Sequence, residues 1–477
     1  FSFFQVSSYT GGQAGSGTAV PSRFSGARAL DPDTCLPLGD LGLENGSGNL
    51  GTAQIEWGDG PAPNCQGGLT APLYAPFNFN PYNVFQTPFK RYNIFGQAHY
   101  EVSDAVEVYA RGLFSKNTVS TIIAPSGSFG GSVTINLNNP FLPATLRNQF
   151  CAFDTTAAVV DPVTGDVISN PYDPRFTEAE CDAAALAVDE DDPNYREVTV
   201  AFNRRSTEVG PRVSDFETTT FDYRMGVRGP LTSTVDWDVS GSYGETEAVQ
   251  EIQGYTLQSR FRQGSLVNVV DGVAVCQDTS NGCVPVDIFG PEGSISPEAA
   301  DFLNEASTTR NKITLGQLRG VVSGDFGYSL PWAAQPIGFA LGTEFRKYEG
   351  TQASDLLAKT AGELGGAGGA APDIVGGYAV YEGYGEIIAP IVEDRPFFES
   401  LTLEAGARYS KYEIDGGGGN DTWTWKAGGS WEPGWGVKIR GNYSKAVRAP
   451  NLGELFTPAT VGLTNLGVDP CAGAQTP

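Results

Sequence analysis

The chain has 477 residues, of which 61 are glycine and 11 % are aromatic, whereas methionine and histidine occur once each. No stretch of about 18 apolar residues occurs, so a helical membrane span is excluded and any crossing would have to be made by strands. The formal charge of −25, from 30 basic and 55 acidic residues, argues against nucleic acid as a partner, because phosphates require basic surfaces.

Most of the chain alternates apolar and polar residues, which predicts strands joined in hairpins. In chain order the predicted hairpins join 92–102 to 106–114, 221–228 to 235–243, 313–328 to 336–347, 378–390 to 401–412, and 423–431 to 436–445. About ten such residues, tilted by about 40°, span about 25 Å, the height of the apolar band of an outer-membrane barrel. We therefore predict an all-β fold, a transmembrane antiparallel β-barrel; a soluble sandwich is the alternative for any single hairpin.

The alternation also assigns the two faces of the predicted wall. In the second hairpin we expect one set of residues to face lipid: Phe221, Tyr223, Met225, Val227, Trp237 and Val239. The lumen-facing set is then Asp222, Arg224, Asp236 and Asp238. Aromatic residues near strand ends predict a girdle at the lipid–water boundary, with core packing as the alternative: Tyr92, Tyr100, Tyr328, Trp332, Tyr378, Trp423, Trp431 and Trp435.

Short turns alternate with long loops, as in outer-membrane barrels, whose long loops are extracellular. The predicted long loops are 10–88, 119–213, 249–310, 351–376 and 415–419. The segment 196–209 also alternates, and we interpret it as a strand extension above the membrane, because a crossing there would put the next long loop in the periplasm. Counting 1–9 as a strand end gives about eleven crossings, so we expect about half of a plugged barrel of about 22 strands.

Seven cysteines occur, none in a C-x-x-C pair and none near the single histidine, which makes zinc or iron–sulfur ligation improbable. Sequential pairing within single loops predicts the disulfides Cys35–Cys65, Cys151–Cys181 and Cys276–Cys283, all on the extracellular side and in an oxidising compartment. Cys471 is left without a predicted partner.

Catalytic motifs are weak. His99 shares a predicted face with Asn93, Gln97 and Glu101, which favours a wall-lining role over proton transfer. The glycine-rich segment 361–370 lacks the ending of a phosphate loop, and the acidic run 189–192 lacks EF-hand spacing, so a solvated loop is favoured there over a calcium site. We predict no enzyme activity, no cofactor and no metal.

Candidate ligand-binding residues lie near the expected outer rim: Arg204, Arg205, Arg212, Arg448, Asn451 and Glu454. Guanidinium groups suit carboxylate or phosphate groups of a ligand. The alternative is that the arginines pair with interior acids such as Asp215 and Glu217.

The segment 443–458, YSKAVRAPNLGELFTP, leaves the last predicted strand and enters a loop at Pro450. It resembles a signature of TonB-dependent outer-membrane receptors. Three further segments, 81–117, 138–143 (NNPFLP) and 383–413, look similar to a large proteobacterial group of that family. In combination, these motifs are specific.

The resemblance implies a bacterial outer-membrane, multi-pass barrel that imports a scarce solute, such as a siderophore, cobalamin, haem, an oligosaccharide or a peptide. The alternative is a passive porin or surface adhesin built on the same wall. Implied partners are the TonB–ExbB–ExbD complex, membrane lipid and lipopolysaccharide, and the substrate; a surface lipoprotein is a further candidate. We expect residues 1–477 to form one partial barrel domain, with no plug domain, TonB box or C-terminal strands visible.

Overall fold

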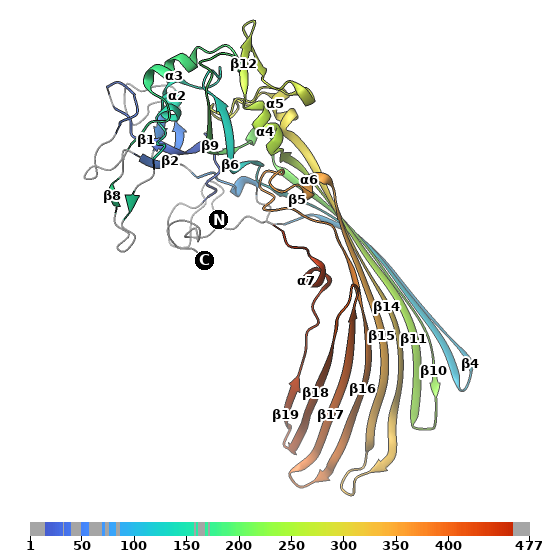
Figure 1. The fold of residues 1–477 in the computed structure, drawn as a ribbon. Coiled ribbons are helices and arrows are strands. Elements are labelled where there is room, and N and C mark those ends of the chain that lie inside the picture. The colour runs from blue at the N-terminus through green and yellow to red at the C-terminus, as the bar shows by residue number, and fades with distance from the viewer. Residues whose placement is uncertain are drawn as a thin grey trace.

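The computed structural model describes residues 15–31, 33–39, 49–56, 69–71, 76–82, 86–156, 159–160, 167–169 and 172–460. Its largest part is a ten-stranded antiparallel sheet, which curves as a tall open wall (Figure 1). Its strands, in order across the sheet, are β4 (Phe89–Ser103), β5 (Val106–Ile123), β10 (Arg212–Pro230), β11 (Val235–Thr256), β14 (Asn304–Ser329), β15 (Pro336–Ser354), β16 (Ile374–Arg395), β17 (Phe398–Ile414), β18 (Gly419–Gly434) and β19 (Val437–Lys445). All ten predicted strands between residues 92 and 445 are present in this wall. Residues 1–9 lie outside the described part of the chain.

The strand register gives the wall one apolar face and one polar face. Tyr223 pairs with Gly112 and Tyr243, and Val227 pairs with Val239. Residues 221, 223, 225 and 227 thus share a face with Trp237 and Val239, whereas Asp222, Arg224, Asp236 and Asp238 lie on the other, as predicted. The apolar face continues across the sheet through Leu318, Leu341, Ile387, Leu403 and Ile439. We call these the apolar face and the polar face.

The strands are longer than the predicted ten or so residues; β14 alone has 26. Their upper ends carry charges even on the apolar side, where Lys312 pairs with Glu245 at 2.9 Å and Arg310 approaches Glu247 at 3.7 Å. Ion pairs between neighbouring strands sustain the ladder beyond the apolar band, because these side chains can remain in water. The wall therefore extends above the expected membrane thickness.

Three of the predicted long loops converge on a separate body above the wall (Figure 1). A five-stranded sheet forms its centre, in the order β3 (Leu69–Ala71), β2 (Asn49–Glu56), β1 (Arg23–Arg28), β9 (Glu197–Arg205) and β6 (Gly127–Asn136). The segment 196–209 is a strand outside the wall, as expected, but it does not extend a wall strand. Val198, Val200 and Phe202 alternate into a hydrophobic core instead, and β9 pairs with β1 and β6.

Short helices and hairpins complete the upper body and the upper edge of the wall. They are η1 (Asn80–Tyr82), α2 (Ala144–Cys151), β7 (Val159–Val160), β8 (Val167–Ser169), α3 (Glu178–Ala185), η2 (Thr207–Val209), α4 (Gln258–Gly264), β12 (Val267–Val270), β13 (Val273–Cys276), η3 (Ser280–Gly282), α5 (Pro297–Leu303), α6 (Leu356–Lys359) and α7 (Leu452–Phe456). Phe24 packs edge-on against Phe150, and Phe202 against Phe289, which joins the sheet to residues from all three loops. Within the described residues, no helix is long and apolar enough to cross a membrane.

Two of the predicted disulfides are present. Cys151–Cys181 joins α2 to α3 with a Cα–Cα distance of 6.0 Å, and Cys276–Cys283 closes the end of β13 at 6.2 Å. Cys65, the predicted partner of Cys35, and Cys471 lie outside the described residues. The two bridges lie in the upper body.

Candidate functional site

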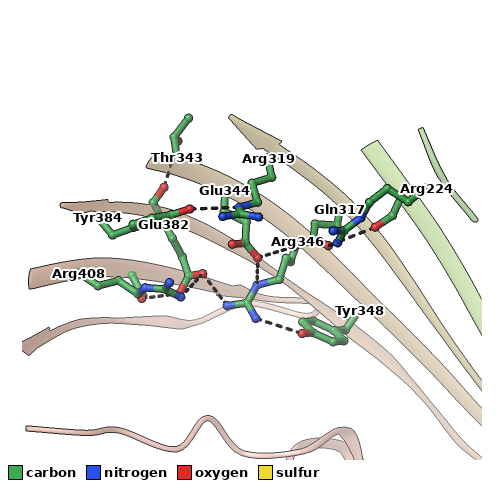
Figure 2. A network of polar contacts seen from close by, with 12 residues as sticks. Arg224, Gln317, Arg319, Thr343, Glu344, Arg346, Tyr348, Glu382, Tyr384 and Arg408 are labelled. Carbon is green, nitrogen blue, oxygen red and sulfur yellow. Dashed lines mark hydrogen bonds and ion pairs between the residues drawn. The ribbon is translucent and has the colours of Figure 1, made fainter. Parts of the chain in front are cut away.

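Charged side chains gather on the polar face of the wall at mid-height, around Glu382 of β16 (Figure 2). The Glu382 carboxylate accepts hydrogen bonds from Arg346 at 2.6 Å, from Arg408 at 3.3 Å and from the Ser410 hydroxyl at 2.6 Å. Its side chain is only 2 % exposed. Both carboxylate oxygens therefore have partners, which is what a buried charge requires.

The same network continues toward β10. Arg346 Nε lies 3.1 Å from the carboxylate of Glu344, which accepts a bond from the Gln317 amide at 2.7 Å. Gln317 in turn accepts bonds from Arg224 at 3.2 Å and from the Ser242 hydroxyl at 3.1 Å. Six neighbouring strands thus contribute to one continuous polar network.

Tyrosines flank the network on both sides. Arg346 donates to the Tyr348 hydroxyl, and Arg319 donates to that of Tyr384. The Arg408 guanidinium lies 4.7 Å from the Tyr384 ring centre, a cation–π contact. The prediction that Tyr378 belongs to the aromatic girdle at the lipid boundary is wrong. The strand register places Tyr378 on the polar face, where its ring stacks on that of Tyr348 at 4.9 Å.

Beside the network the polar face is hollowed. A hollow of about 510 Å³ is lined by residues of β15 to β19, which include Lys445, and on one side by Ala446, Val447 and Ala449, which follow β19. Its volume lies within the range of about 300–1,000 Å³ typical of small-ligand sites. We call it the wall hollow.

The motif segment 446–456 forms the upper margin of the wall hollow. Asn451 caps α7 by accepting from the Glu454 N–H, and the Glu454 carboxylate accepts from the Asn451 N–H, a reciprocal capping box. Arg448 donates two bonds to the same carboxylate, at 2.8 and 2.9 Å. These interactions lower the pKa of Glu454 to about 2, chiefly through Arg448 and next through the Asn451 N–H.

Two glycines allow this segment to lie against the wall. A Cβ on Gly350 would stand 2.5 Å from Leu452 Cδ1, and one on Gly376 would stand 2.4 Å from the Phe456 ring. A side chain at Gly376 would therefore push the Phe456 ring away, and one at Gly350 would displace at least the end of the Leu452 side chain. Because both glycines belong to the polar face, we call 446–456 the strap across that face.

The structure places the six predicted ligand residues in two groups. Arg448, Asn451 and Glu454 lie together in the strap, bonded to one another. Arg204 and Arg205 are buried within the upper body, Arg212 is buried at the start of β10, and they donate to the main-chain carbonyls of Gly290, Pro125 and Ala124, respectively. A ligand role for all six stays a prediction.

The alternative, that these arginines pair with interior acids, holds for Arg204 but not with the two acids named as examples, Asp215 and Glu217. Arg204 pairs with Glu208 at 3.0 Å, and Glu217 pairs with Lys116 at 2.7 Å. Burial lowers the pKa of Arg205 to about 10, and its guanidinium lies 4.7 Å from the ring centre of Phe77 and 4.8 Å from that of Phe129.

The remaining sequence candidates make ordinary contacts. His99 is exposed and lies 3.4 Å from Glu107. Asp189 and Asp192 accept bonds from N–H groups of their own loop. In the part of the chain that the structure describes, no group of three potential ligands is arranged to hold a metal ion. Calcium binding by the run 189–192 stays untested.

Sequence reasoning missed Glu382, Arg346 and Arg408. Each is a charged residue in the middle of an alternating strand and follows an apolar residue: Tyr381, Phe345 and Ala407, respectively. That signal places a charge on the polar face. It cannot show which charges meet, because the partners come from different strands.

Residues 163–470 match the protein family described as TonB dependent receptor-like, beta-barrel. Among solved structures, the chain is similar to the ferric-catecholate import receptor Fiu from E. coli K12 in its open form, with 10 % identity over 76 % of this chain and a TM-score of 0.27. The chain spans 47 % of that structure, about half its length. None of the curated proteins matches the chain in sequence.

Proposed function

This chain belongs to the TonB-dependent receptor β-barrel family of the bacterial outer membrane, and from that membership we propose that the whole protein imports a scarce solute with energy supplied by TonB. The proposed energy source is the TonB–ExbB–ExbD complex. The proposed solute is a siderophore, cobalamin, an oligosaccharide or a peptide.

The observation that carries the proposal is the two-faced wall with a network and a hollow on its polar face. The apolar face suits lipid, and the polar face offers a solute fixed donors and acceptors. In the described residues, β4 and β19 each pair with one neighbour, so the sheet is open at both edges. We propose that residues 1–477 form part of a barrel domain of about 22 strands.

The test is solute uptake by cells that carry the full-length gene. The expected result is uptake of one of these solute classes that saturates at low concentration and is lost when TonB is deleted. Uptake that persists without TonB, together with steady conductance of the purified protein in planar bilayers, would instead establish a passive porin. Cell attachment without uptake would establish an adhesin.

A further inference from the structure

A hairpin of the upper body, formed by β12 and β13, ends in exposed valines. It projects from the upper body on the side away from the wall (Figure 1). At its tip, Asp271 and Gly272 have φ angles of 51° and 81°, the left-handed pair that closes a two-residue hairpin. Val270 and Val273 pair across this turn and are 54 % and 62 % exposed, and Val269 is exposed as well. Apolar side chains therefore stand at the free end of a projecting element.

The base of this hairpin is held on both strands. On β12, the side-chain amide of Asn136 donates to the Val267 carbonyl at 2.7 Å and accepts from the Val267 N–H at 3.1 Å, as a neighbouring strand would. On β13, the disulfide Cys276–Cys283 ties the last residue of the strand to the loop that follows. A hairpin fixed in this way loses little conformational freedom when it binds a partner, which favours binding.

A second exposed apolar segment lies beside the hairpin. Asn138, the first residue of the NNPFLP segment, donates to the main-chain carbonyl of Ala187 at 3.1 Å and to the Asn268 side chain of β12 at 3.2 Å. Leu186 and Val188, on either side of Ala187, are exposed. One asparagine side chain thus holds the two exposed segments together. We call their exposed apolar residues the apolar patch: Leu186, Val188, Val269, Val270 and Val273.

Acidic side chains accompany the apolar patch on both segments. The stretches 186–197 and 267–278 contain one basic residue, Arg196, which donates to the main-chain carbonyls of Pro193 and Tyr195. Their carboxylates are Asp189, Glu190, Asp191, Asp192, Glu197, Asp271 and Asp278. These two stretches therefore carry a net negative charge beside the exposed valines.

This charge selects the kind of partner. A second copy of the chain would bring the same carboxylates and a formal charge of −25, and anionic lipid headgroups would be repelled as well. A protein with lysine and arginine side chains around an apolar contact would be attracted instead. An apolar centre with a charged rim is also the usual arrangement of a protein–protein interface.

We propose that the apolar patch is the docking site of a partner protein with a basic surface. Val270 and Val273 enter an apolar recess of that protein, and the carboxylates of the two stretches pair with its lysines and arginines. This inference goes beyond the proposed uptake function, because it concerns a protein partner of the upper body and does not depend on the solute.

The test places the photo-activatable residue p-benzoylphenylalanine at position 270 of the full-length protein, in cells of the species that encodes it. We expect a cross-link to one discrete protein, which mass spectrometry identifies and which is then purified. Its Kd for the full-length protein in detergent should rise at least about tenfold in the double variant Val270→Ser with Val273→Ser. The Kd should also rise at least about tenfold between 0.05 and 0.5 M salt, because salt screens the charged rim.

The matched control is Ile168→Ser, which changes an exposed apolar residue in another hairpin of the chain, β7 and β8, and should leave the Kd unchanged. A cross-link to a second copy or to lipopolysaccharide alone would overturn the proposal, as would the absence of any cross-link or a Kd that salt does not change. If the valine variant does not fold, Asp191→Lys takes its place, with a Kd raised at least about threefold at 0.05 M salt. An unchanged Kd in a folded variant also overturns it.

Discussion

At the scale of the residue, the wall is organised by charges that are buried and paired. Glu382 is the centre, because two arginines and a serine from the neighbouring strands converge on its two oxygens. Such a cluster adds less to stability than its number of bonds suggests, since desolvation offsets much of the attraction. Its main effect is to fix the positions of Arg346 and Arg408 beside the wall hollow.

Removing the centre should therefore be costly. Glu382→Ala leaves two guanidinium groups without their carboxylate, and we expect the free energy of unfolding to fall by about 3–5 kcal/mol. Glu386→Ala is the matched control on the same strand and face, where a half-exposed pair with Lys426 should contribute less than about 1 kcal/mol. Denaturant unfolding in detergent measures both. An equal decrease in the free energy of unfolding for both variants would show that the burial of Glu382 does not increase its contribution to stability.

Glu454 should titrate far below an ordinary glutamate. Its pKa is lowered from 4.5 to about 2, so the charged pair with Arg448 stabilises the strap fully above pH 4.5, and that contribution is lost as the pH falls through about 2. NMR of carboxyl-labelled glutamate in micelles gives the midpoint directly. Arg448→Gln should move the midpoint upward toward 4.5. A wild-type midpoint already near 4.5 would mean that the strap is open in solution.

At the scale of the element, the position of the strap depends on two glycines of the polar face that leave space for its side chains. Leu452 and Phe456 occupy the space above Gly350 and Gly376, and the capping box gives the short helix α7 a defined start. A helix of this length has little stability of its own. Its position therefore comes from the wall beneath it.

A side chain larger than glycine at position 350 or 376 should move the strap away from the polar face. We expect Gly350→Val or Gly376→Val to raise the rate at which a thiol reagent labels Thr422→Cys, which lies under the strap, by at least about tenfold, because the new side chain overlaps Leu452 or Phe456. Gly383→Ala is the control, since its Cβ meets nothing within 4 Å. The labelling rate is compared with that of the parent chain. Unchanged labelling in folded valine variants would contradict the role of these glycines.

At the scale of the whole molecule, the division into two faces matches the two environments of an outer-membrane wall. Met225 is 65 % exposed on the apolar face and lies beside Gly241 and Ala110, which leaves it open to lipid. The upper body closes its own core and carries both of the described disulfides. The wall thus exposes apolar side chains to lipid, whereas the upper body buries its apolar side chains in its own core.

A charge on the lipid side should be costly and one on the lumen side should not. We expect Met225→Arg to destabilise the folded barrel in lipid by about 2–4 kcal/mol. Ser323→Arg, which the register places on the polar face, should cost much less. Reversible unfolding in lipid vesicles gives both values. A larger loss for Ser323→Arg would mean that the two faces have been assigned the wrong way round.

The sequence by itself determined the wall strands, their faces and two described disulfides. The reason is that a period of two is a local property: Tyr223 and Met225 share a face whatever strand lies beside them. The cysteine pairs likewise lie within single loops. The family signature at 443–458 is also a contiguous segment that can be read directly.

Tertiary structure alone decided which distant residues meet. The segment 196–209 alternates like a wall strand, but its partners β1 and β6 come from other parts of the chain, and only their pairing shows that it belongs to the upper body. Likewise, Arg346 and Arg408 lie 62 positions apart in the sequence, and adjacent registers bring both to Glu382. Local periodicity gives the face of a side chain, whereas the register between strands gives its neighbours, and the chemistry of the wall hollow depends on those neighbours.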